Sequence, residues 1–356
     1  MNPNELRLEY PFGDTLPESG TVMEVADGVK WIRMPLPFAL DHINLWLLRD
    51  RIEGRDGWTL IDCGVARPEV KELWGKIFEQ ALEGLPILRV VVTHMHPDHV
   101  GLAAWLCERW QAPLWMTATD FFVARLWSQP VVDTKAMGGP NGESAVVHFA
   151  RHGMTDPDHL EQIRQRASYY PNLVEPVPTH YRRMMHGDSF DMGGREWQVI
   201  VGYGHAPEHA TFYCPELKVL ISGDMVLPRI STNVSVFDFE PEANPLPLYL
   251  DSLNRYDGLP EETLVLPSHG KPFRGLHERI SQQHEHHDER LAEVLEACAE
   301  PLSTADVVPV LFKRKLDLHQ LTFAMGEALA HLHALYFEGK LKRSLGEDGI
   351  YRFQRA

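Results

Sequence analysis

The stretch VVTHMHPDHVGL, residues 91–102, guides the interpretation of the rest of the chain. It places three histidines and one aspartate between His94 and His99, directly after a run of β-branched residues that is typical of a strand. In an extended segment His94 and His96 lie on the same face and could bind one metal ion. Asp98 and His99 follow Pro97, which changes the backbone direction and could aim them at a second ion. The alternative is a chance cluster of surface residues.

Potential metal ligands also follow three later strand-like segments. A single histidine at a strand end is most often an ordinary polar residue. Together with residues 94–99, however, potential ligands follow four separate strands, which argues against coincidence. We expect the neighbouring His209 to be a packed or hydrogen-bonding loop residue and not a ligand. The residues at the three exits are His205 in GYGHAPEHATF, Asp224 in LISGDMV and His269 in LVLPSHGKPF.

The order of elements predicts an α/β fold. Between residues 20 and 119, apolar strand-like runs alternate with helical patterns such as 67–82, whose apolar residues recur at helical spacing. This alternation favours a sandwich with helices packed on sheets. Residues 120–186 break the rhythm with Gly- and Pro-rich stretches, including MGGPNG at 137–142. We interpret them as an insertion, either a lid over a site or an ordinary helical elaboration.

The last part of the chain predicts three helices and a hairpin. A long polar helix is expected from residue 276 on, and Ser303 and Thr304 are plausible N-cap residues for the next. An apolar helix then ends at Gly339, and a hairpin turns at Asp348-Gly349. This order is typical of a winged helix. We expect His284, His286 and His287 of the polar helix to lie on an exposed face and not to bind metal.

Length and composition limit the possible functions. The 356 residues predict two domains, 1–275 with the insertion and 276–356. Four scattered cysteines indicate neither a disulfide framework nor a cysteine zinc site. No apolar run approaches the ~20 residues that span a bilayer, and no secretory signal is visible, so we expect a cytoplasmic protein without membrane contact. The net charge of −16 disfavours nucleic acid as a partner.

These motifs together resemble the metallo-β-lactamase fold superfamily over roughly residues 20–275. The H-x-H-x-D-H signature and the three later ligand motifs occur in the expected order, and Asp62 in LIDCG matches the family's early acidic residue. The resemblance implies an αββα sandwich with a site for two metal ions at one edge. It also implies that Asp62 either accepts a hydrogen bond from a ligand histidine or lies beside the metals. The first ion would be held by His94, His96 and His205, the second by Asp98, His99 and His269, with Asp224 bridging both.

The resemblance implies hydrolysis by a metal-bridging hydroxide, with Asp98 and Asp62 as the catalytic carboxylates. The ligand set suits two Zn²⁺ ions, although Fe or Mn would also fit. No motif for a serine nucleophile, a P-loop or a dinucleotide cofactor is present. We therefore predict a metal-dependent hydrolase of a small ester-type substrate, with an acyl thioester favoured. A single-stranded nucleic-acid or phosphodiester hydrolase and a di-iron redox enzyme are the alternatives. The aromatic residues that could shape an acyl pocket, or could equally belong to the core, include Trp115, Phe121, Trp127, Tyr169 and Tyr170.

Two branches of the superfamily bear on the substrate. Thioesterases similar to glyoxalase II usually carry two glycines after the signature, where this chain has HVGLAAW, which puts glutathione specificity in doubt. The tail resembles the winged-helix appendage of a branch that includes enzymes cleaving single-stranded RNA. Residues 301–356, however, have eight basic and six acidic residues and no basic stripe. We expect this tail to pack against the catalytic domain or a partner subunit, so homo-oligomerisation stays open.

Overall fold

Two β-sheets packed face to face form the centre of the molecule. The computed structural model describes residues 4–129, 142–165 and 169–356. In the first sheet four strands run antiparallel and the remaining three join in parallel. The order of this sheet is β1 (Val22–Ala26), β2 (Val29–Pro35), β3 (His42–Ile52), β4 (Arg55–Ile61), β5 (Ile87–Val91), β6 (Leu114–Met116) and β7 (Arg182–Arg183).

The second sheet has five strands and is antiparallel except for one parallel pair, β11 with β12. Its order is β12 (Leu264–Pro267), β11 (Val219–Gly223), β10 (His209–Cys214), β9 (Arg195–Gly202) and β8 (Ser189–Met192). Large apolar side chains fill the space between the sheets, among them Trp31 and Trp46, whose rings stack with centroids 6.2 Å apart. Burying such aromatic surface is a main stabilising contribution to the sandwich.

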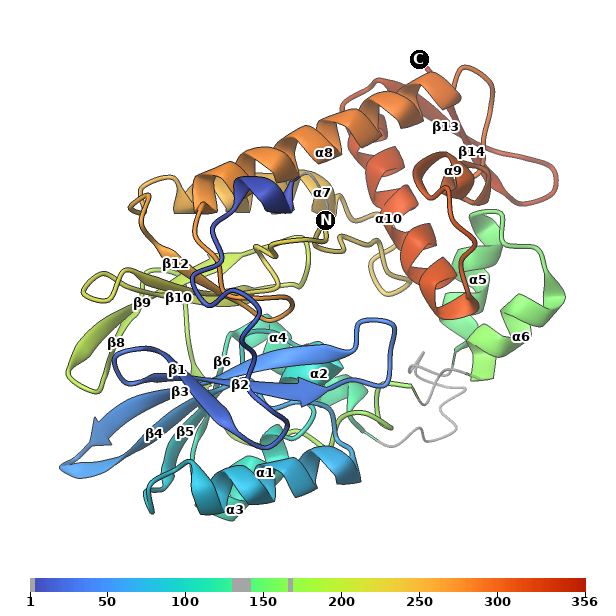
Figure 1. Cartoon of the computed structure of the whole chain (residues 1–356). Helices are drawn as coiled ribbons and strands as arrows, with labels where there is room; N and C mark the ends of the chain where they lie inside the picture. Colours follow the sequence, from blue (N-terminus) through green and yellow to red (C-terminus); the bar gives the residue numbers. More distant parts are fainter. Residues whose placement is uncertain (1–3, 130–141, 166–168) are drawn as a thin grey trace.

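Helices cover the outer face of each sheet (Figure 1). Helix α1 buries Val70, Trp74 and Ile77 from its apolar face against the first sheet, as its spacing predicted. The predicted αββα sandwich is therefore confirmed. The helices of this part are α1 (Pro68–Gln80), α2 (Pro97–Val100), α3 (Ala103–Trp110), α4 (Ala118–Trp127), α5 (Glu143–Arg151), α6 (Pro157–Gln165) and α7 (Pro245–Leu253).

The C-terminal unit has the predicted order of three helices and a hairpin. Capping boxes begin its second and third helices, at Ser303 with Asp306 and at Asp317 with Gln320. Gly339 follows the last helix with a φ of +75°, which fits the expected C′ position. That this unit is a winged helix stays a prediction. Its elements are α8 (Leu276–Ala297), α9 (Thr304–Leu311), α10 (Leu318–Phe337), β13 (Leu341–Leu345) and β14 (Tyr351–Arg355).

One continuous apolar core joins the second sheet to the C-terminal unit. It includes Leu220 of β11, Leu246 of α7, Ile280 of α8 and Leu329 of α10, all buried. Figure 1 shows α8 running along the sandwich and on into the C-terminal unit. The expected domain boundary near residue 275 thus falls just before α8, which packs against both the sandwich and the rest of the C-terminal unit.

The insertion 120–186 is helical where the structure describes it. Helices α5 and α6 lie beside α9 and α10 (Figure 1), and the amide of Ala305 donates to the carbonyl of His152 at 3.0 Å. Farther along, the hydroxyl of Tyr170 donates to the carbonyl of Met95, between two of the predicted ligands. Most of MGGPNG, residues 137–141, lies outside the described residues. A role as a lid stays a prediction.

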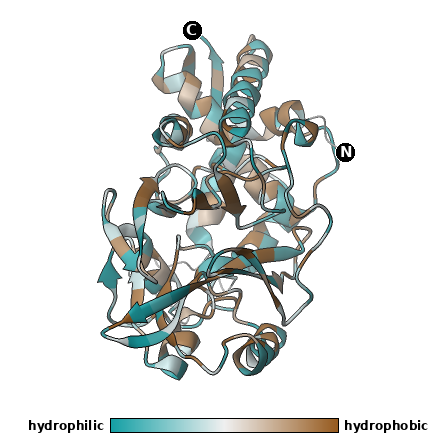
Figure 2. Ribbon diagram, turned by 60° about the vertical axis from the view of Figure 1, so that its left-hand side comes forward, coloured by the Kyte–Doolittle hydropathy of each residue, from teal (hydrophilic) through white to brown (hydrophobic). Residues whose placement is uncertain are grey.

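The helices in Figure 2 carry both hydrophobic and hydrophilic residues. Among the residues that the structure describes, no helix is both long enough and apolar enough to cross a bilayer.

Candidate metal centre

All seven predicted ligands converge at one edge of the sandwich. His94 and His96 follow β5, and Asp98 and His99 lie in the short helix α2. The remaining three lie within three residues of the ends of strands of the second sheet: His205 after β9, Asp224 after β11 and His269 after β12. Strand ends fix the directions of these side chains, because the preceding residues are held in the sheet.

One group of donor atoms consists of three histidine nitrogens and a carboxylate oxygen. Nε2 of His94 lies 2.9 Å from Nδ1 of His96 and 3.2 Å from Nε2 of His205. Oδ2 of Asp224 lies 3.3 Å from Nε2 of His205 and 3.9 Å from Nε2 of His94. The four atoms thus surround one point.

A second group uses the other oxygen of the same aspartate. Oδ1 of Asp224 lies 3.4 Å from Nε2 of His269 and 3.6 Å from Nε2 of His99. Oδ2 of Asp98 lies at the same two distances, 3.4 Å from His269 and 3.6 Å from His99. Asp224 therefore stands between the two groups and directs one oxygen at each.

Hydrogen bonds at the far side of the rings fix three of the histidines. Nδ1 of His205 lies 2.7 Å from the carbonyl of Asn233, and Nδ1 of His269 lies 2.8 Å from the carbonyl of His42. Because a carbonyl only accepts, Nδ1 of each of these two rings is the donor, and Nε2 is the nitrogen that faces the other ligands. Nδ1 of His99 lies 2.8 Å from Oδ2 of Asp62, which has the same effect.

Asp62 occupies a conformation that few residues adopt. Its φ is +62°, in the left-handed region that aspartate tolerates better than most non-glycine residues. Its carboxylate accepts hydrogen bonds from the amide and the hydroxyl of Thr93, at 2.8 and 2.9 Å. The same hydroxyl lies 3.0 Å from Nδ1 of His94. Asp62 thus contacts one predicted ligand directly and a second through Thr93.

The donor set fits two metal ions. Four donors placed tetrahedrally at the usual Zn–N distance are about 3.3 Å apart, close to the separations within both groups. Nε2 of His99 and Oδ1 of Asp224 are buried and have no hydrogen-bond partner. Buried polar atoms without partners are rare and require an explanation. A cation between them supplies one.

The charges around the two groups differ. Burial lowers the pKa of His94 well below its usual value and that of His96 to about 3, and neighbouring histidines add to the effect. Burial also opposes protonation of His269, but Asp224 and Asp98 outweigh it and raise its pKa to about 10. Burial alone would raise the pKa of Asp224, yet His269 and His99 hold it well below its usual range. Carboxylates therefore dominate the electrostatics of the second group, whereas neighbouring histidines dominate those of the first.

His209 packs behind the centre, and its Nε2 accepts a hydrogen bond from the amide of Asp224 at 3.0 Å. A side chain on Gly223 would meet this ring at 2.3 Å, so glycine is required there. His209 is a hydrogen-bonding residue as expected, but it is the first residue of β10 and not part of a loop.

Sequence reasoning missed Asp120, which braces two of the ligand segments. This buried carboxylate accepts the amide of Met95 at 2.7 Å and the amide of Glu208 at 2.6 Å. Burial is the main reason that its pKa is raised to about 7. No spacing of residues in the sequence marks Asp120, because its partners are backbone amides and not particular side chains. His42 and Asn233 were missed for the same reason, since they offer main-chain carbonyls.

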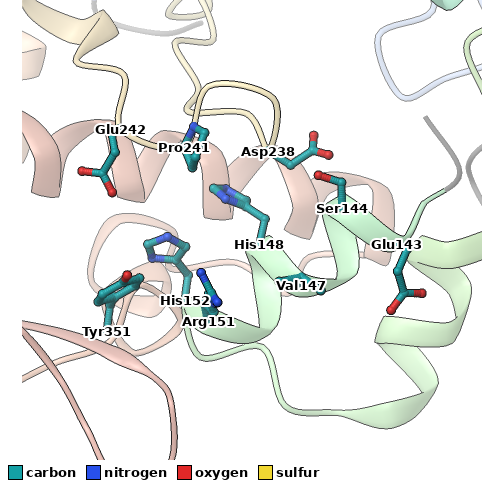
Figure 3. A pocket seen from close by; sticks show the side chains of 10 residues that line it. All are labelled: Glu143, Ser144, Val147, His148, Arg151, His152, Asp238, Pro241, Glu242 and Tyr351. Atoms are coloured by element: carbon teal, nitrogen blue, oxygen red, sulfur yellow. The ribbon is translucent and has the colours of Figure 1, made fainter. Parts of the chain in front are cut away.

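Three of the aromatic residues considered for an acyl pocket belong to the core. Trp115 lies between the sheets, whereas Phe121 and Tyr170 pack in the core on the outer face of the first sheet, and all three are buried. A cavity of about 450 Å³ lies elsewhere, and none of its lining residues is a predicted ligand (Figure 3). Its residues come from α5, β14 and the connection before α7: Glu143, Ser144, Val147, His148, Arg151, His152, Asp238, Pro241, Glu242 and Tyr351.

Comparison with known families identifies the chain. The family described as the metallo-beta-lactamase superfamily matches residues 40–269, which include all the residues of the centre. The chain belongs to the metallo-beta-lactamase superfamily. A second family, described as the metallo-beta-lactamase-like C-terminal domain, matches residues 291–356. The C-terminal unit is thus a family feature as well.

Solved structures of superfamily members share the fold over all or nearly all of the chain. A beta-lactamase domain protein from Burkholderia ambifaria is 55% identical, covers 100% of both chains and superposes with a TM-score of 0.93. A metallo-beta-lactamase family protein from Thermus thermophilus is 26% identical, with a TM-score of 0.75 over 94% of this chain and 100% of that one. The arrangement of sandwich and C-terminal unit is therefore shared by other members.

Sequence relatives include named hydrolases. The probable metallo-hydrolase YqjP of Bacillus subtilis is 26% identical over 318 residues, which is 86% of this chain and 92% of that protein. A hydroxyacylglutathione hydrolase of Erythrobacter litoralis is 29% identical over 212 residues, or 55% of this chain and 81% of that protein.

Proposed function

We propose that this superfamily member is a dinuclear metal-dependent hydrolase. His94, His96 and His205 would hold the first ion, and Asp98, His99 and His269 the second. The observation that carries the proposal is the position of Asp224, whose two oxygens face separate groups of donors at 3.3–3.9 Å and 3.4–3.6 Å. A carboxylate in this position suits a bridging ligand. The imidazole and carboxylate donors, with no thiolate among them, suit Zn²⁺.

Two divalent ions in such a site make water nucleophilic near neutral pH and polarise the substrate oxygen, so hydrolysis needs no side-chain nucleophile. The chain's own residues arrange this site. His94, His99 and His205 are buried, whereas His96 and Asp98 are partly exposed. We infer that substrate approaches from the side of His96 and Asp98. Asp98 would then be the carboxylate that contacts the reacting atoms, and Asp62, acting through His99, a positioning residue.

Within this activity we propose an acyl thioester as the substrate. The likeness to hydroxyacylglutathione hydrolases, which are thioesterases by name, supports this choice. A thioester also needs little help with its leaving group, because a thiolate departs without protonation. The net charge of −16 supports a small substrate over a nucleic acid.

The proposal is tested with zinc-loaded protein on a panel of acyl-CoA and glutathione thioesters, with bis(p-nitrophenyl) phosphate as the phosphodiester control. We expect turnover of at least one thioester, its loss on treatment with EDTA and its return with added Zn²⁺. Turnover of the phosphodiester alone would replace the thioester by a phosphoryl substrate. Protein that binds no zinc in elemental analysis would contradict the dinuclear assignment itself.

A further inference from the structure

The connection from β11 to α7 lies between the metal centre and helix α10. Within it, residues 232–236 contact the centre on one side. The hydroxyl of Thr232 donates to the carbonyl of Asp224, and the carbonyl of Asn233 accepts from Nδ1 of His205 at 2.7 Å. Two predicted ligands are thus hydrogen-bonded to one short stretch of chain.

The other side of this stretch is attached to α10. Nδ2 of Asn233 donates to Oε2 of Glu327 at 3.2 Å, and the amide of Val236 donates to the carbonyl of Gly326 at 3.1 Å. The hydroxyl of Ser235 donates to Oδ1 of Asn233 at 2.7 Å. That bond orients the amide of Asn233, because it leaves Nδ2 to face Glu327.

The close approach of the stretch to α10 depends on a glycine. A side chain at position 326 would meet Oγ of Ser235 at 2.7 Å and Cβ of Ser235 at 2.8 Å. Gly326 is buried in the interior of a helix, where glycine costs about 1 kcal/mol relative to alanine. The contact offers a physical reason for a glycine at this place.

Helix α10 is a firm support for such a contact. It has 20 residues, begins with a capping box and buries eleven residues between Ala324 and Leu335, most of them in the core shared with the second sheet. The main-chain carbonyl of Glu327 also accepts from Nδ1 of His331, one turn later. Glu327 is therefore held by its own helix while its side chain reaches Asn233.

We propose that Glu327, in the C-terminal unit, is a positioning residue for the metal centre, acting on His205 through Asn233. This inference rests on the proposed dinuclear function. Because the acceptor for His205 is a main-chain carbonyl, the place of residues 232–236 decides where that carbonyl lies, and Glu327 holds those residues. Hydrogen-bond partners behind a metal-binding histidine typically change metal affinity by about 10- to 100-fold.

The test compares Glu327→Leu with Glu327→Gln in the full-length protein. Leucine removes the acceptor for Asn233, whereas the glutamine oxygen can still accept. Metal-free protein is titrated with Zn²⁺ against a chromophoric chelator, and the two binding steps are resolved. We expect Glu327→Leu to weaken one step about 10-fold and leave the other unchanged, and Glu327→Gln to restore the affinity. Absorption spectra of the Co²⁺-loaded proteins should change in the leucine variant only.

A second variant approaches the same contact from the backbone. Gly326→Ala should displace residues 232–236 and weaken the same step, while Gly75→Ala in α1, where a side chain meets nothing within 4 Å, serves as the matched control. Equal zinc affinities and Co²⁺ spectra for Glu327→Leu, Gly326→Ala and the natural protein would overturn this inference and leave the dinuclear assignment standing. Natural protein that binds no zinc would overturn the proposed function itself.

Discussion

Nδ1 of His99 lies 2.8 Å from Oδ2 of Asp62, and both side chains are buried. The pair fixes the ring of His99 so that Nε2 faces Asp98 and Asp224. In the proposed dinuclear centre, this contact sets the direction and the basicity of one ligand of the second ion.

Replacing Asp62 by asparagine should weaken the second ion. Asparagine tolerates the φ of +62°, so the turn is kept while the charge behind His99 is lost. We expect affinity for that ion to fall about 10- to 100-fold. Zinc titration against a chelator measures this. Asp56→Asn, an exposed change on β4, the strand that leads to Asp62, is the control, and equal affinities in the two variants would contradict the role of Asp62.

Replacing Asp224 by alanine should abolish occupancy by two ions, because both groups lose an oxygen donor. Elemental analysis of the purified variant is expected to give at most one zinc per chain. His205→Ala should mainly weaken the first ion, since its Nε2 faces only that group. Asp251→Ala, an exposed change on α7, should leave two ions in place. Two ions retained in Asp224→Ala would argue against bridging.

Replacing Asp120 by alanine should destabilise the fold even without metal. The amides of Met95 and Glu208 would lose their shared buried acceptor. We expect a loss of about 2–4 kcal/mol in the free energy of unfolding, measured by urea denaturation of metal-free protein. The stability of Asp120→Asn should lie between those of Asp120→Ala and the natural protein, because asparagine keeps one acceptor oxygen and replaces the other by an amide donor. An alanine variant as stable as the natural protein would show that these bonds contribute little.

His287 should make the fold sensitive to mild acid. Burial, with His331 beside it, lowers its pKa to about 2. The unfolded chain takes up this proton near pH 6.5 and the folded chain does not, so stability is present above pH 6.5 and is lost as pH falls below it. His287→Gln keeps a donor for His331 without titrating. Urea denaturation at pH values between 7 and 5 measures how the free energy of unfolding falls with pH. In His287→Gln it should fall less steeply than in the natural protein, by up to about 1.4 kcal/mol per pH unit. Parallel slopes would contradict this role.

The residues alone showed potential ligands after four separate strands, and the family resemblance implied that these strand ends meet at one edge of a sandwich. His94 and His96 could be grouped from alternation alone. The residues behind the ligands could not be predicted this way. Asn233 and His42 act through carbonyls that every residue possesses, and Glu327 lies far from the centre in the chain. Only the folded backbone brings these groups to His205 and His269.

The expectation that the histidines of α8 form an exposed face was wrong for His287, which is fully buried. The sequence of α8 is polar along its whole length, but the polar side chains on its buried face form hydrogen bonds within the protein. Arg279 donates to the carbonyls of Leu227 and Ile230, and the ring of His287 lies 3.2 Å from that of His331. Polarity along a helix therefore does not show which face is covered when hydrogen bonds satisfy the buried groups.

The unbroken interior from β11 through α8 to α10 limits how this protein can be divided. A truncated version that stops before residue 276 would bare Leu220, Leu246 and their neighbours to water, and would aggregate instead of forming a smaller enzyme. Heating should likewise melt both regions together in a single calorimetric transition. Exchange of the tail between relatives would succeed only if the facing half of the sandwich were exchanged with it.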